Sequence, residues 1–107
     1  MKMDEQRFSL RLSELRIRKN VSAREMSLAI GQNPSYINRI ENGQSYPSMQ
    51  CFFYICEYLG ISPAEFFDID NVDPHMKHEI VDALKHLDAK KLDIVLSVIQ
   101  GLSGAQK

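Results

Sequence analysis

Polar side chains recur at helical spacing in the segment GQNPSYINRIENG, residues 31–43. At about 100° per residue, four of them share one helical face: Ser35, Asn38, Arg39 and Asn42. Ile37 and Ile40 fall on the opposite face, where a core would bury them. Arginine pairs with guanine edges, asparagine with adenine edges, and serine with either. The outward face therefore has the chemistry needed to read base pairs.

Two helices separated by a short turn would position this face. The first would begin at Ser22, which forms a capping-box signature with Glu25, and would end at the glycine that opens the turn. The second, expected over residues 34–42, would be capped by Asn33, with a proline at its first position. The segment from Ser22 to Gly43 thus has the pattern of a helix-turn-helix.

The whole chain of 107 residues has helical periodicity and no alternating strand pattern. We therefore predict an all-α fold, with a five-helix domain over residues 1–68 and a C-terminal two-helix extension over residues 69–107. The expected helices cover about residues 4–19, 22–31, 34–42, 48–59, 63–68, 74–87 and 89–102. In the first helix the expected core positions are Phe8, Leu10, Leu12, Leu15 and Ile17.

The net charge of −1 conceals an asymmetry between the two parts of the chain. Residues 1–46 contain eight Lys or Arg against five Asp or Glu, whereas residues 47–107 contain five against nine. A polyanion-binding surface needs such a basic segment. Each charge can equally serve solubility alone, and both readings stay open for the basic cluster of Arg7, Arg11, Arg18, Lys19 and Arg24.

The stretch SAREMSLAIGQNPSYINRIENG, followed by PSMQCFFYICEYLGISPAEFF, resembles the phage-repressor-type domain of the Xre family. The resemblance covers about residues 8–68. It implies a five-helix, lambda-repressor-like fold and sequence-specific binding of double-stranded DNA through helix 34–42. A transcriptional regulator, acting as a repressor, is the function expected from it.

The resemblance assigns roles to individual positions. Asn33, Ser35 and Arg39 match sites that reach base edges, Tyr36 is a further candidate, and the helical wheel adds Asn38. The expected contacts to the DNA backbone are Ser22 and Asn42, with Lys19 and Arg24 from the basic cluster. Arg16 and Glu41 match a structural ion pair. Ala23 and Pro34 depart from polar residues of the family, which implies fewer contacts for each half-site.

Other function classes find less support in the sequence. No motif pairs a nucleophile with a base or cradles phosphate, so we expect neither an enzyme nor a cofactor. His75, His78, Asp82 and His86 lie near one helical face, but we expect packed or solvated side chains and no metal. The alternative function is an antitoxin or another protein-interaction module that retains the helix-turn-helix fold.

The cellular location is expected to be the cytoplasm. The N-terminus lacks the apolar segment of a signal peptide, and no apolar run approaches the roughly 18 residues of a membrane span. Cys51 and Cys56 lie in one expected helix and point in different directions, as suits reduced thiols.

The last expected helix carries more apolar residues than one neighbour can cover. Helix 74–87 would cover one side, and a second copy of the chain would bury the rest, through Leu92, Val95, Leu96 and Ile99. A two-fold dimer would also place two recognition helices about 34 Å apart on one face of DNA. The alternative is that helix 89–102 folds back onto helices 48–59 and 63–68 of its own chain.

Overall fold

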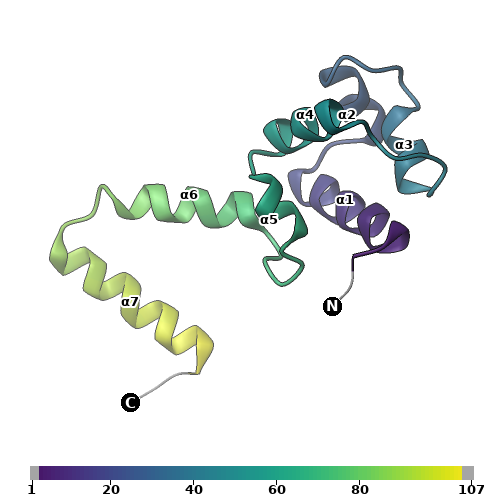
Figure 1. Ribbon diagram of the computed structural model, residues 1–107. Coiled ribbons are helices and arrows are strands. Elements are labelled where there is room, and N and C mark those ends of the chain that lie inside the picture. Colours follow the sequence, from purple (N-terminus) through teal and green to yellow (C-terminus); the bar gives the residue numbers. More distant parts are fainter. Residues whose placement is uncertain (1–2, 105–107) are drawn as a thin grey trace. The chain divides into compact units, whose positions relative to one another are not determined.

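The computed structural model describes residues 3–104, which form seven helices and no strand (Figure 1). The helices are α1 (Glu5–Lys19), α2 (Ala23–Ala29), α3 (Tyr36–Glu41), α4 (Met49–Leu59), α5 (Pro63–Phe67), α6 (Pro74–Leu84) and α7 (Ala89–Ser103). The all-α prediction is confirmed. By its internal contacts the chain divides into two compact units, Met1–His75 and Met76–Lys107.

Helix α1 is central to the first unit, because it contacts α3, α4 and α5, while α2 contacts α3. Phe8 of α1, Phe52 of α4 and Phe66 of α5 form an aromatic centre, with ring centroids 5.1–6.0 Å apart. Around it lie the other buried apolar residues: Leu12, Leu15, Met26, Ile30, Ile37, Ile40, Ile55, Cys56, Leu59 and Ile61. Helices α2 and α3 pack against this core through their buried residues.

Two expected core positions of α1 are wrong. Leu10 is 59% exposed and Ile17 is 61% exposed. The buried stripe of α1 consists of Phe8, Leu12 and Leu15 with Arg11 among them, and a stripe of this width leaves the far side of the helix in water. Arg11, which was expected on the surface, is therefore buried, whereas the two aliphatic residues are exposed.

The helix ends follow local capping signals. Ser48 and Ser62 accept hydrogen bonds from the amides of the third helical residues, and Ser62 forms a full capping box with Glu65. Gly60 ends α4 in the left-handed conformation at φ 72°. Both cysteines of α4 are free thiols.

The second unit contains most of α6 and all of α7. Asp88 caps α7 by accepting a hydrogen bond from the amide of Lys91 at 2.9 Å. Helix α6 ends at Leu84, before the expected residue 87, because residues 85–87 form turns with carbonyls three residues back.

The contact-based boundary at His75 lies beyond the expected boundary at residue 68. Residues 1–2 and 105–107 of the expected segments lie outside the described part of the chain.

Two properties of the part of the chain that the structure describes bear on other classes of protein. None of the helices is both long and apolar enough to cross a membrane. Between residues 3 and 104, no three His, Cys, Asp or Glu side chains are grouped as a metal site would need.

Candidate nucleic-acid interface

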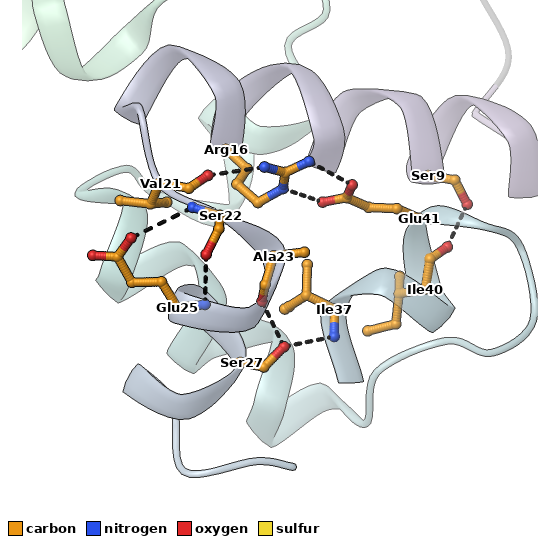
Figure 2. A network of polar contacts seen from close by, with 10 residues as sticks. All are labelled: Ser9, Arg16, Val21, Ser22, Ala23, Glu25, Ser27, Ile37, Ile40 and Glu41. Atoms are coloured by element: carbon orange, nitrogen blue, oxygen red, sulfur yellow. Dashed lines mark hydrogen bonds and ion pairs between the residues drawn. The ribbon is translucent and has the colours of Figure 1, made fainter. Parts of the chain in front are cut away.

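Helix α2 begins with the capping box that the sequence predicts. The Ser22 hydroxyl accepts a hydrogen bond from the Glu25 amide at 2.9 Å, and the Glu25 carboxylate accepts one from the Ser22 amide at 3.5 Å (Figure 2). Both interactions satisfy amides that no helical carbonyl can reach. The start of α2 is therefore fixed by its own first turn.

The turn between α2 and α3 differs from the expectation. The side-chain oxygen of Asn33 accepts hydrogen bonds from the amide and the hydroxyl of Ser35, at 3.1 and 3.0 Å. This local bonding keeps Pro34 and Ser35 in a turn, so α3 begins at Tyr36 instead of residue 34. Ser35 occupies the cap position without a side-chain capping bond. Asn33 thus caps the turn and not the helix.

Ser27 joins α2 to α3 and was not predicted from the sequence. Its fully buried hydroxyl donates to the carbonyl of Ala23 at 2.7 Å and accepts from the amide of Ile37 at 2.9 Å (Figure 2). The amide of Ile37 lies in the first turn of α3, where no helical carbonyl is available to it. Ser27 therefore positions the start of the recognition helix.

Replacing Ser27 with alanine should lower the free energy of unfolding by about 1–3 kcal/mol, because a buried amide loses its acceptor. Chemical denaturation of the variant measures this loss. Ser103→Ala, which removes an exposed hydroxyl at the end of α7, is a control expected to change stability little. Equal stabilities of the Ser27→Ala variant and the natural chain would show that another acceptor serves Ile37.

The inner side of α3 is held by the core and by α1. Ile37 and Ile40 are fully buried, and the hydroxyl of Ser9 donates to the carbonyl of Ile40 at 2.8 Å. The guanidinium of Arg16 makes two bonds to the Glu41 carboxylate, at 2.7 and 2.9 Å (Figure 2). A third bond, at 2.8 Å, reaches the carbonyl of Val21 before α2.

The ion pair is well shielded from solvent, with side-chain exposures of 16% for Arg16 and 10% for Glu41. The hydrogen bonds that Arg16 donates to the Glu41 carboxylate raise the pKa of Arg16 above its ordinary value, although burial acts in the opposite direction. The pair is the one that the family resemblance implies. It connects α1, the entry to α2 and the end of α3 through one side chain.

The outward side of α3 carries the candidate reading groups. Asn33, Ser35, Asn38, Arg39 and Asn42 are exposed. Among the described residues, no hydrogen bond or ion pair engages the side chains of Asn38, Arg39 and Asn42. Their donors and acceptors are therefore available to a ligand. Asn33 and Ser35 are exposed but bonded to each other, so the Oδ1 of Asn33 and the hydroxyl hydrogen of Ser35 are already engaged.

Tyr36 lies partly inward. Its side chain is half-buried, and burial followed by contact with the Cys51 thiol raises its pKa to about 12. Its contact with α4 leaves it less free to reach a base than Arg39.

The candidate backbone contacts lie around α2. Ser22, Arg24 and Lys19 are exposed, and the Lys19 ammonium lies 5.1 Å from the ring centroid of Tyr58. Ser22 already serves as a helix cap. Arg11 must be removed from the expected basic surface, because its side chain is 2% exposed and bonds backbone carbonyls.

Comparison with known proteins identifies this arrangement. A family model described as helix-turn-helix matches residues 12–66, just over half of the chain. The chain belongs to the helix-turn-helix family. As a member of this Xre-like family it is a DNA-binding transcriptional regulator, a class that is not normally enzymatic.

Two solved helix-turn-helix proteins are similar to it. The restriction-modification controller protein C.AhdI from Aeromonas hydrophila is 33% identical, with a TM-score of 0.56 over 60% of this chain and 93% of that chain. The clp gene regulator ClgR from Corynebacterium glutamicum is 20% identical, with a TM-score of 0.56 over 98% of both chains, and shows the fold alone. No curated protein matches this chain.

Proposed function

We propose that this regulator is a repressor that reads a specific DNA sequence in the major groove as a homodimer. The observation that carries the proposal is the outward face of α3, where the side chains of Asn38, Arg39 and Asn42 are exposed and unengaged while the inner face is fixed by buried contacts. A preorganised helix of this kind binds base edges without first losing its own hydrogen bonds.

The proposed roles follow chemistry and exposure. Arg39 and Asn38 are the main base readers, with Asn33, Ser35 and Tyr36 as further contacts. Ser22, Arg24, Asn42 and Lys19 contact phosphates, which position the protein without specifying sequence. Repression needs only occupation of promoter DNA, so the reading unit suffices for it. A cytoplasmic location suits a regulator that binds DNA.

A homodimer is proposed because six residues of α3 read few bases. Helix α7 has no buried residue, and the apolar Leu92, Leu96 and Ile99 are 39%, 51% and 50% exposed. Val95 is half-buried on the same side of the helix. A second copy of the chain would remove this surface from water.

One observation favours the alternative of a protein-interaction module. Phe53 and Phe67 are 50% and 44% exposed, and their rings lie 6.2 and 5.4 Å from that of Phe52. Exposed aromatic clusters of this kind occur at protein interfaces. Selection of bound fragments from random DNA separates the two functions: a repressor enriches a common sequence, whereas an interaction module enriches none.

Replacing Arg39 with alanine should weaken binding to the selected site by about 1–3 kcal/mol and relax the preference at one base pair. The reason is that a guanidinium bonding two base acceptors discriminates among base pairs. Affinity measured on the selected site and on its single-base variants tests this prediction.

The matched control is Arg24→Ala, which removes an exposed arginine of α2. We expect it to weaken all sequences equally and to make the salt dependence shallower, because it removes a phosphate contact. If Arg39→Ala gave this uniform pattern instead, Arg39 would be a backbone contact.

A further inference from the structure

Arg11 is a buried charge that the reading surface does not use. It lies on the same stripe of α1 as Phe8 and Leu12, and its side chain is 2% exposed. Burial lowers the pKa of its guanidinium, while the nearby carboxylates of Glu14 and Asp68 oppose this shift. An arginine remains charged even so, and a buried charge must find hydrogen-bond partners.

Backbone carbonyls supply these partners. The Nε of Arg11 donates to the carbonyl of Phe66 at 2.6 Å. Its Nη2 lies 2.7, 2.9 and 3.0 Å from the carbonyl oxygens of Glu65, Asp68 and Asn71. Glu65 and Phe66 belong to α5, and Asp68 is its C-cap. Asn71 belongs to the connection between α5 and α6. One side chain of α1 thus fixes both segments.

A second contact fixes the start of α6. Pro74 is fully buried, and the imidazole of His75 packs against Gly60 at the end of α4. A Cβ at Gly60 would lie only 2.6 Å from Cδ2 of His75, so a larger residue there would displace the ring. The short connection between α5 and α6 is therefore attached at both ends.

We propose that Arg11 and Gly60 fix the point where the chain leaves the DNA-binding unit, and thereby set the spacing between the two half-sites that a dimer reads. This inference rests on the proposed homodimer. Two reading units joined through their C-terminal segments can only separate as far as the connections allow. A connection that is bonded to Arg11 allows a narrower range of distances between the two reading units. A free connection would allow many spacings.

The experiment uses the full chain and DNA that carries two copies of the selected half-site. The distance between their centres is varied by single base pairs, and the affinity is measured for each spacing. We expect the natural chain to prefer one narrow range. Arg11→Met should flatten this preference at least several-fold, while the preferred sequence of each half-site stays the same.

Gly60→Ala tests the same connection without removing the charge, and serves if Arg11→Met fails to fold. It should also broaden the spacing preference, because it displaces His75. The control is Gly104→Ala. Gly104 has a similar φ of 73°, but no neighbour lies within 4 Å of a Cβ added there. The strain of a left-handed alanine is then present without the displaced ring.

The outcomes distinguish this inference from the proposed function. If the natural chain has a narrow preference and folded variants at both positions keep it, the inference is wrong and the homodimer stands. If the natural chain binds single half-sites as a monomer, both are wrong. If the variants at Arg11 and Gly60 have a broader spacing preference than the natural chain and read the same half-site sequence, both the inference and the homodimer are supported.

Discussion

Glu41→Ala should lower the free energy of unfolding by about 2–4 kcal/mol. Removal of one partner strands the guanidinium of Arg16, which is only 16% exposed and keeps just its bond to the carbonyl of Val21. The estimate lies slightly below that for a fully buried pair, because some water reaches both side chains. For a chain of this size the melting temperature should fall by roughly 10–20 °C.

Thermal and chemical unfolding measure the effect. Glu41→Gln retains the shape and one acceptor but not the charge, so we expect an intermediate loss. Glu57→Ala removes an exposed carboxylate of α4 and is the matched control, with little expected change. A Glu41→Ala protein that unfolds like the natural chain would show that the ion pair contributes nothing to stability.

The features predicted correctly depend on neighbours close in sequence. Ser22 and Glu25 form their capping box because both partners lie within one helical turn. Gly60 ends α4 for a local reason too, since the left-handed conformation is least strained for glycine. The seven helices of residues 3–104 and their approximate bounds follow from such signals. The Arg16–Glu41 pair, separated by 25 positions, came from the family resemblance alone.

The features missed depend on distant partners or on competition between local bonds. The partners of Arg11 lie 54–60 positions away, and no periodicity in α1 distinguishes a buried arginine from a surface one. The sequence alone does not distinguish Ser27 from a serine on the exposed face of a helix. The late start of α3 results from the side chain of Asn33 bonding Ser35, where a helix cap was expected.

Introducing two glutamates at Leu96 and Ile99 should convert a dimer into a monomer. These side chains lie within one turn of each other on α7 and are half-exposed in the single chain. In a dimer they would be buried, and two carboxylates there would lack partners. The affinity for DNA with two half-sites should then fall about 10²- to 10⁴-fold, while binding to one half-site is unchanged.

Light scattering gives the mass, and the control keeps the same change in charge. Lys90→Gln with Ser97→Glu also changes the net charge of α7 by −2, but at polar positions about 100° or more around the helix from Leu96. This control should remain dimeric, because it leaves the apolar surface intact. A natural chain that is monomeric at micromolar concentration, or a double-glutamate variant that stays dimeric, would remove α7 from the interface. The first result would favour the alternative in which α7 packs within its own chain, and each recognition helix would then read DNA alone.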